Sequence, residues 1–199
     1  MSRCSAKLAG VLLVAALVTA GCGVDPLEVS EAGTVETGSG GILSASGETG
    51  RIAYGGGNPN VSIEEALSVN MTTVDGSAID VSQFLGQDVV LWFWAPWCAW
   101  CNAEAARLDT VASEFEGQVE VVGVAGASDR TSMMEFVDRH ELGHLTHLAD
   151  LDGHFWTTLD VSYQPWWMFI NEDREVVSNW QGRLDESQIR ELMTRLVEL

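Results

Sequence analysis

Hydrophobic residues follow two different periods on either side of a short turn. Residues 89–94, Val-Val-Leu-Trp-Phe-Trp, form a continuous apolar run rich in β-branched and aromatic side chains, which predicts a strand buried on both faces. Across residues 105–117 the apolar side chains recur instead at helical spacing and stop at a glycine, which predicts a helix that ends there. A buried strand therefore leads directly into a helix, and Cys98 and Cys101 lie at the junction.

Shorter patterns predict the other elements of an α/β chain. Asp75-Gly76 is a turn signal between two strand-like segments, so we expect a β-hairpin there. The order strand, helix, strand over residues 89–125 predicts a right-handed parallel unit. The remaining strand-like segments are 67–73, 78–81, 119–125, 166–170 and 175–181, and the helical ones are a turn or helix at 82–86, helices at 131–141 and 153–159, and a C-terminal helix opened by Asp185.

The first residues have the composition of an export signal. A basic start is followed by an apolar stretch over residues 8–18, which is too short for a comfortable membrane span. We expect residues 1–21 to be a signal peptide. Thr19-Ala20-Gly21-Cys22 resembles a bacterial lipobox, with Thr where Leu is usual, and cleavage before Cys22 would be followed by its diacylation. The alternative is ordinary secretion with a free Cys22.

Residues 22–60 are rich in Gly, Ser, Thr and Glu and show no periodic pattern. Such a segment cannot bury enough apolar surface to offset the entropy of ordering it. We interpret it as a flexible tether, attached to lipid at Cys22, with an end-to-end distance of about 35 Å. Residues 61–199 are long and apolar enough to form one domain with a single core.

The chain is strongly acidic, with 29 Asp and Glu against 10 Lys and Arg and a formal charge of −19. Two of the cations belong to the predicted signal peptide, so the mature chain is more acidic still. This excess argues against binding to nucleic acid. It also disfavours electrostatic docking on anionic lipid, so attachment to a membrane would depend on the lipid anchor.

Counting the cysteines narrows the chemistry. Cys4 leaves with the signal peptide and Cys22 would be acylated, so Cys98 and Cys101 are the pair left in the domain. A structural zinc site needs four ligands, and the sequence has no second pair, so we predict no metal. A purely structural disulfide would close a very short loop and add little stability. Helix N-terminal amides favour a thiolate at Cys98, the outer cysteine, so a redox-active pair is the preferred interpretation.

The sequence around the pair resembles a known redox family. Trp97-Cys98-Ala99-Trp100-Cys101, directly after Phe93-Trp94-Ala95, is similar to the active site of the thioredoxin superfamily. Glu104, three residues beyond the second cysteine, narrows the resemblance to the extracytoplasmic TlpA/ResA/DsbE-like group, including secreted actinobacterial members. The resemblance runs from about Leu67 to the C-terminus. It implies a thioredoxin-like α/β fold, in which a central mixed sheet has helices on both faces and an N-terminal β-hairpin extension.

The resemblance also implies roles for residues beyond the cysteines. Pro165, directly before the strand at 166–170, matches the cis-proline that faces the disulfide in thioredoxin-like folds, and Gln164 would then pair with a substrate chain. The alternative is a proline tolerated at the first residue of a strand. Glu104 lies one helical turn beyond Cys101, and burial would suit it to exchange a proton with that cysteine. The alternative is an exposed Glu in a first turn.

The chain departs from the family pattern at three places. Trp92 stands where thioredoxin has a buried Asp, which leaves Glu104 as the acid nearby in sequence. Ala99 and Trp100 lack the Pro that is common between the cysteines, and Ala106 replaces the Pro that usually kinks the following helix. These departures leave the redox potential open, although not the chemistry.

A second motif predicts a different chemistry. His140-Glu141-Leu142-Gly143-His144 satisfies the His-Glu-x-x-His pattern of zinc proteases, and Asp150 has the spacing of a third ligand. The pattern works only when both histidines share one helical face, and Gly143 is typical of a helix stop. A metalloprotease is therefore the remote alternative, and we expect His147 and His154 at the surface.

We expect an extracytoplasmic thiol-disulfide oxidoreductase that forms disulfides in exported proteins, with cysteine-containing proteins as substrates, a membrane redox partner and no cofactor. Reduction of apocytochrome c or copper-site thiols, as in TlpA- and ResA-type relatives, is the alternative direction. Trp97 and Trp100 are expected to contact substrate. Together with Trp166 and Trp167 they could also form an apolar rim around the cysteines, although aromatic clusters are more often core. In a third alternative the disulfide is inert, and this rim makes the chain a thioredoxin-like binding module.

Overall fold

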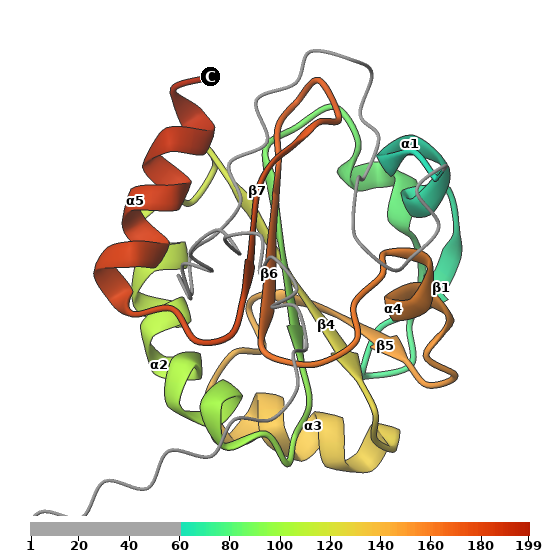
Figure 1. The fold of residues 1–199 in the computed structure, drawn as a ribbon. Coiled ribbons are helices and arrows are strands. Elements are labelled where there is room, and N and C mark those ends of the chain that lie inside the picture. Colours follow the sequence, from blue (N-terminus) through green and yellow to red (C-terminus); the bar gives the residue numbers. More distant parts are fainter. Residues whose placement is uncertain (1–60) are drawn as a thin grey trace, which may run out of the picture. The chain divides into compact units, whose positions relative to one another are not determined.

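The computed structural model describes residues 61–199, which are coloured in Figure 1. The predicted signal peptide (1–21), the predicted tether (22–60) and Cys22 lie outside these residues and stay predictions. Among residues 61–199, no helix has both the length and the apolarity needed to cross a bilayer.

A mixed five-stranded sheet forms the centre of the described chain. Its strands are β3 (Val89–Trp94), β4 (Glu120–Gly126), β5 (Thr146–Asp150), β6 (Trp166–Ile170) and β7 (Val176–Gln181). Their order across the sheet is β5-β4-β3-β6-β7, with β3, β4 and β5 mutually parallel and β6 antiparallel to both of its neighbours. β3 has the bounds that the apolar run predicted, and every residue in it is buried, because it is the central strand.

Helices cover both faces of this sheet, as the resemblance implied. They are α1 (Ile63–Leu67), the 3-10 helix η1 (Val81–Phe84), α2 (Ala99–Glu114), α3 (Arg130–Arg139), α4 (His154–Thr158) and α5 (Glu186–Val197). Even-numbered residues of β3 point into a core shared with α2, α3 and α5, and odd-numbered ones face α1, η1 and α4. Figure 1 shows α2 and α5 on one side of the sheet and α1 and α4 on the other. The predicted α/β fold is confirmed.

The predicted N-terminal hairpin is present and lies beside β5. Its strands β1 (Asn70–Thr72) and β2 (Ala78–Asp80) pair antiparallel. In the turn, the Asp75 carboxylate accepts a backbone N–H two residues further on at 2.9 Å, which is the local hydrogen bond typical of such turns. The hairpin joins the edge of the sheet where the Val74 N–H donates to the His147 carbonyl at 2.9 Å. It therefore covers part of the edge that β5 would otherwise expose.

The first element differs from the prediction. Residues 63–67 form α1, whereas the apolar pattern predicted that a strand begins at Leu67. Ser62 caps this helix by accepting the Glu65 N–H at 3.1 Å. Glu64 and Glu65 lie in its first turn, where carboxylates interact favourably with the helix dipole. A five-residue helix is too short to show a helical period, so its cap was the signal that could have identified it.

The end of α3 also differs from the prediction. The helix ends at Arg139, and Glu141 rather than Gly143 adopts the left-handed conformation, with φ of 57°. The Leu142 N–H donates to the Val137 carbonyl at 3.0 Å, which is the hydrogen bond that closes a Schellman motif. Leu142 is fully buried below the turn. Its packing therefore stabilises a backbone conformation that glycine would adopt more readily.

His147, expected at the surface, is a buried residue of β5, whereas His154 is exposed as expected. The His147 ring meets Trp94 edge-on with ring centroids 5.6 Å apart, and its Nε2 lies 3.1 Å from the Leu142 carbonyl. Burial lowers the pKa of His147 to about 4, so the ring is neutral near pH 7. Gly123 faces His147 across the strand pair, and a Cβ there would overlap the ring.

Replacing Gly123 with Ala should therefore destabilise the fold. Overpacking a close-packed core typically lowers the free energy of unfolding by about 1–3 kcal/mol, and urea titration should show a loss of that size. Gly143→Ala is the matched control, because a Cβ at Gly143 meets nothing within 4 Å and its φ is not positive. Equal midpoints for the two variants would contradict the close packing of His147 on Gly123.

Candidate active site

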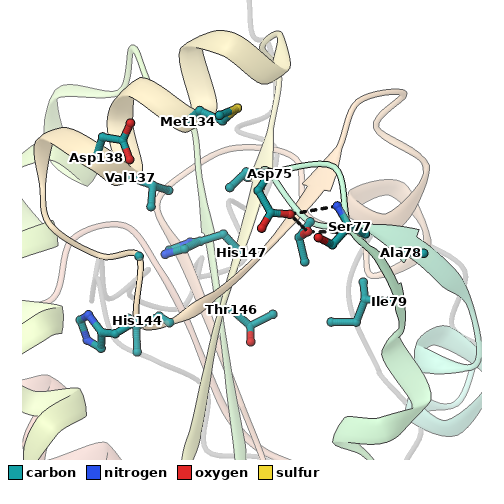
Figure 2. Close-up of a pocket in the computed structure, with 14 residues that line it drawn as sticks. Asp75, Ser77, Ala78, Ile79, Met134, Val137, Asp138, His144, Thr146 and His147 are labelled. Carbon is teal, nitrogen blue, oxygen red and sulfur yellow. Dashed lines mark hydrogen bonds between the residues drawn. The ribbon is translucent and has the colours of Figure 1, made fainter.

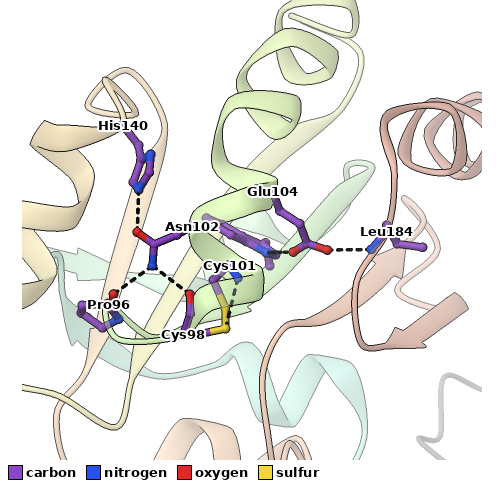
Figure 3. Close-up of a disulfide and its surroundings, with 8 residues drawn as sticks. Pro96, Cys98, Cys101, Asn102, Glu104, His140 and Leu184 are labelled. Atoms are coloured by element: carbon purple, nitrogen blue, oxygen red, sulfur yellow. Dashed lines mark hydrogen bonds between the residues drawn. A yellow bond between two sulfur atoms is a disulfide. The ribbon is translucent and has the colours of Figure 1, made fainter.

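The two cysteines form a disulfide at the start of α2 (Figure 3). Cys98 is the N-cap residue and Cys101 lies in the first turn, with their Cα atoms 5.3 Å apart. The Cys101 N–H donates to the Cys98 Sγ at 3.1 Å. Cys98 is 4% exposed and Cys101 is fully buried. An incoming thiolate therefore reaches Cys98 first, and the helix N-terminus favours a thiolate at that sulfur.

The position of Cys98 is fixed by β3 and a tight turn. β3 ends at Trp94, and the Cys98 N–H donates to the carbonyl of Ala95 at 3.0 Å. The chain thus passes from the middle of the sheet to the start of α2 within a few residues. This places the disulfide beyond the carboxyl ends of the parallel strands, where open α/β sheets usually carry their sites.

Sequence reasoning missed Asn102, which connects two carbonyls of this turn to His140 (Figure 3). Its Nδ2 donates to the carbonyls of Pro96 at 3.1 Å and Cys98 at 2.8 Å. Its Oδ1 lies 2.9 Å from Nε2 of His140, beyond the end of α3. An Asn in the first turn of a helix often hydrogen-bonds to nearby backbone, and this was the only signal available in the sequence.

Glu104 is fully buried behind the disulfide, and so it is not the exposed first-turn Glu of the second interpretation (Figure 3). The Trp92 indole N–H donates to Oε2 at 3.2 Å, and the Leu184 N–H donates to Oε1 at 2.6 Å. Burial raises the pKa of Glu104 to about 7, and these hydrogen bonds oppose the rise only in part. The nearby Trp167 side chain also lowers the pKa of Glu104, although its indole N–H is not aligned for a hydrogen bond to the carboxyl. Near neutral pH this carboxyl can both donate and accept a proton.

The peptide bond between Gln164 and Pro165 is cis, as the resemblance implied. Pro165 is buried directly before β6, and its carbonyl accepts the Gly182 N–H at 2.8 Å. Gln164 keeps part of its surface exposed. Because β6 begins opposite the end of β3, Pro165 stands at the same edge of the sheet as the turn that carries Cys98.

Two of the four tryptophans expected around the cysteines are at the surface. Trp97 is 63% exposed and Trp100 is 57% exposed. Trp166 is 2% exposed and Trp167 is fully buried, because neighbouring residues of β6 point into the two opposite cores. The rim of four tryptophans that the binding-module alternative requires is therefore absent from the described residues, and of the four only Trp97 and Trp100 are exposed. The Arg183 guanidinium lies over the Trp100 ring, 5.1 Å from its centroid, which is a cation–π contact.

The zinc-protease motif does not lie on a helix. α3 ends before His140, and the positive φ of Glu141 turns the chain, so the two histidines do not share a helical face. His140 contacts Asn102, and His144 Nε2 lies 3.3 Å from the Asp109 carboxylate. Within the described residues, no three His, Cys, Asp or Glu side chains are grouped so that they could hold a metal ion. The geometry does not support the metalloprotease alternative.

A cavity of about 500 Å³ lies elsewhere, between the hairpin, α3 and β5 (Figure 2). Its walls include the polar residues Asp75, Asp138, His144 and Thr146, together with the apolar side chain of Met134. The lining residues include none of the redox residues. This cavity is therefore separate from the disulfide.

Similarity to known proteins assigns the chain to a family. The Redoxin family model matches residues 58–193, which is more than half of the sequence. The chain belongs to the redoxin family. Soluble secreted antigen MPT53 of Mycobacterium tuberculosis is 39% identical over 113 residues, which are 57% of this redoxin and 64% of that protein. This redoxin thus spans slightly less than two thirds of MPT53. Thiol-disulfide oxidoreductase ResA of Bacillus subtilis is 28% identical over 143 residues, 71% of this chain and 75% of ResA.

Solved structures share the fold of this redoxin. The crystal structure of a secreted Mycobacterium tuberculosis disulfide oxidoreductase homologous to E. coli DsbE matches with a TM-score of 0.62 and 33% identity, covering 67% of this chain and 99% of that one. The structure of MTB dsbF in mixed oxidized and reduced forms matches with a TM-score of 0.63 and 34% identity, covering 69% and 99%. The thioredoxin-like fold inferred from the sequence is confirmed.

The raised pKa of Glu104 predicts a specific pH dependence of stability. Its pKa is about 7 in the folded chain, against 4.5 as an ordinary value. Between these pH values the folded state binds more protons than the unfolded state, so this residue's contribution to stability should fall by about 3 kcal/mol as the pH rises through that range. Glu104→Gln should remove this part of the pH dependence, measured by urea unfolding of the oxidised protein.

Glu116→Gln is the matched control for this experiment, because Glu116 is exposed near the end of the same helix. Its unfolding free energy should follow that of the unaltered protein at every pH. If the unfolding free energy of Glu104→Gln also changed with pH as that of the unaltered protein does, the carboxyl would have the same pKa in the folded and unfolded states. Its raised pKa would then be ruled out.

Proposed function

We propose that this redoxin is an extracytoplasmic thiol-disulfide oxidoreductase that forms disulfides in exported proteins. The observation that carries the proposal is the layering of the site, in which Cys98 keeps 4% of its surface exposed, Cys101 is fully buried behind it, and Glu104 is buried one turn further along α2. A cysteine pair with a buried acid of near-neutral pKa is suited to proton-coupled exchange. The relatives named as disulfide and thiol-disulfide oxidoreductases support the same chemistry.

In the oxidising direction, a substrate thiolate attacks the Cys98 Sγ and the bond between Cys98 and Cys101 breaks. The bonding electrons leave with the Cys101 sulfur, and the substrate is joined to Cys98 as a mixed disulfide. A second substrate thiolate attacks the substrate sulfur, and Cys98 leaves as a thiolate that the Cys101 N–H and the start of α2 stabilise. The substrate loses two electrons and the enzyme gains them. A membrane redox partner then takes these electrons and restores the disulfide.

Glu104 supplies the proton that the Cys101 sulfur needs as it leaves. Cys101 is fully buried, so a lasting thiolate there would be an uncompensated charge in an apolar core. With a pKa of about 7, the neutral carboxyl can protonate that sulfur. The carboxylate that results keeps the hydrogen bonds from Trp92 and Leu184. In the reverse direction the same group takes the proton back.

Substrate binding falls to the exposed groups around Cys98. Trp97 and Trp100 flank it in sequence and present large apolar surfaces. Gln164 is partly exposed at the same edge of the sheet, and its backbone can pair with an extended substrate chain as an added strand does. Pro165 holds this segment in place. Main-chain pairing with apolar side contacts suits unfolded, cysteine-containing polypeptides better than a single folded partner.

Export and anchoring follow from the N-terminal segment of the sequence. A signal peptide over residues 1–21 would carry the domain across the membrane, and diacylated Cys22 would hold it there on the tether of residues 22–60. The word "secreted" in the name of MPT53 supports an extracytoplasmic location. The domain would then act on proteins as they emerge from the membrane.

Reduction of disulfides formed by apocytochrome c or copper-site thiols, which restores those thiols, is the second candidate function. It is favoured by the similarity to ResA, which is named a thiol-disulfide oxidoreductase. In that direction the Cys98 thiolate attacks a substrate disulfide and Cys101 resolves the mixed disulfide. In both directions the substrate is joined to Cys98, and Cys101 forms or leaves the disulfide with it. Only the source of electrons and the reduction potential therefore separate the two functions.

Replacing Cys101 with Ser should trap the intermediate. Without the buried thiol, a mixed disulfide between Cys98 and a substrate cysteine cannot be resolved within the enzyme. Non-reducing electrophoresis and mass spectrometry should then show an adduct at Cys98 when the variant is mixed with a scrambled, disulfide-containing substrate. Cys98→Ser is the control and should give none. Absence of any adduct would leave the disulfide inert and favour a thioredoxin-like binding module.

The reduction potential of the Cys98 and Cys101 pair should decide the direction. Equilibration with glutathione, followed by tryptophan fluorescence, is expected to give a value near or above about −180 mV, the range of protein disulfide isomerase and stronger oxidants. A value near or below about −270 mV, where thioredoxin lies, would contradict the oxidase and support the reductase.

A further inference from the structure

The side chain of Asn102 contacts the turn that presents the reactive sulfur. Its two N–H groups reach different carbonyls, that of Pro96 at 3.1 Å and that of Cys98 at 2.8 Å. The Cys98 carbonyl also accepts the backbone N–H of Asn102 at 3.1 Å. One residue thus fixes the carbonyl groups of both Pro96 and Cys98 (Figure 3). Asn102 is only partly buried, so these contacts, rather than packing alone, determine how its side chain is held.

His140 determines which way the Asn102 amide faces. Its Nε2 lies 2.9 Å from Oδ1, and its ring rests on Phe136 with ring centroids 4.5 Å apart. Burial, and to a lesser extent Arg139, lower the pKa of His140, which favours a neutral ring. Because Oδ1 can only accept a hydrogen bond, the contact with Asn102 requires the proton on Nε2. If the Asn102 amide were rotated by half a turn, its oxygen would face the carbonyl oxygens of Pro96 and Cys98. Its NH₂ group would then face the Nε2–H of His140. The contact with His140 therefore orients both donors of Asn102 toward the turn.

We propose that Asn102, oriented by His140, is a positioning residue that sets the reduction potential of the cysteine pair. It acts through Cys98, whose backbone has the N-cap conformation and whose Sγ accepts the Cys101 N–H at 3.1 Å. This inference rests on the proposed redox function and adds to it a residue that tunes the equilibrium.

The direction of the effect follows from which form the contacts stabilise. In the reduced enzyme, the Cys101 N–H and the start of α2 stabilise a thiolate at Cys98. Stabilising the reduced form makes the disulfide a stronger oxidant. Loss of the Asn102 contacts loosens the Cys98 backbone and weakens this stabilisation, so the disulfide becomes harder to reduce.

The second histidine of the same segment provides a natural comparison. His144 Nε2 lies 3.3 Å from the carboxylate of Asp109, also on α2, but both side chains are about half exposed. An exposed pair of this kind contributes little to stability, and nothing connects it to the cysteines. Asp109→Asn therefore removes the charge from a contact between the same two segments without touching the turn at Cys98.

The test is the glutathione equilibrium of the full chain for the unaltered protein and for Asn102→Ala, His140→Ala, His140→Gln and Asp109→Asn. Asn102→Ala should shift the equilibrium about three- to tenfold toward the disulfide, since one or two hydrogen bonds have net effects of that order, and tenfold corresponds to about 30 mV. His140→Ala should shift it in the same direction by less. His140→Gln, whose amide N–H can still reach Oδ1, should restore it, and Asp109→Asn should leave it unchanged.

The double variant Asn102→Ala/His140→Ala separates a relay from two independent effects. If His140 acts through Asn102, the double variant should have the potential of Asn102→Ala alone. Titration of the thiolate absorbance of the reduced proteins provides the second readout, and the pKa of Cys98 should rise in Asn102→Ala. A variant that merely loosened the fold would lower the unfolding midpoint without moving these two values.

Several outcomes would overturn the inference. Unchanged potential and Cys98 pKa in Asn102→Ala would do so, and so would a shift in Asp109→Asn as large as that in Asn102→Ala. Should Asn102→Ala not fold, His140→Ala and His140→Gln carry the test, and equal potentials for the two would be decisive against it. If the unaltered protein itself exchanged no electrons with glutathione, the proposed function would fail first and this inference with it.

Discussion

The burial of β3 is the constraint on which the site depends. Every residue of this strand is buried, with side chains alternating between two cores. A slip of one residue against β4 or β6 would exchange the side chains of the two cores, so the register is strongly specified. The register of β3 therefore fixes where the strand ends in the sheet, and the turn from Ala95 to Cys98 begins at that point. The N-cap sulfur, the disulfide and the first turn of α2 all take their places from that point.

The acid of this site comes from the helix rather than from the strand. Where the resemblance to thioredoxin implies a buried Asp, β3 carries Trp92, whose indole N–H donates to Glu104 at 3.2 Å. The Leu184 N–H, 80 residues further along the chain, donates to the other carboxyl oxygen at 2.6 Å. Two donors make burial of the carboxyl tolerable, yet desolvation still holds its pKa near 7. The chain thus keeps one titratable acid behind the cysteines while Trp92 fills the core that an Asp would have made polar.

Local patterns predicted the elements that are long or wholly apolar, and the rest depends on contacts between distant segments. β3, β6 and α5 appear at or near their predicted bounds because an apolar run or a helical stripe is visible in one stretch of sequence. The cysteine pair was likewise visible in one short stretch, whereas the sequence left open whether Glu104 is buried or exposed. Asn102 was missed because its partner, His140, lies 38 residues away. His147 was misplaced because the room for its ring comes from Gly123 on a neighbouring strand, and strand pairing is not encoded in either residue.

The His-Glu-x-x-His motif illustrates how backbone geometry decides what a sequence pattern does. On a continuous helix its two histidines would lie one turn apart on one face and could share a metal. α3 ends before the motif, and the positive φ of Glu141 redirects the chain. His140 therefore reaches Asn102 and His144 reaches Asp109, about two turns apart on the same side of α2. A pattern that would bind zinc on a longer helix instead connects the end of α3 to the helix that carries the redox pair.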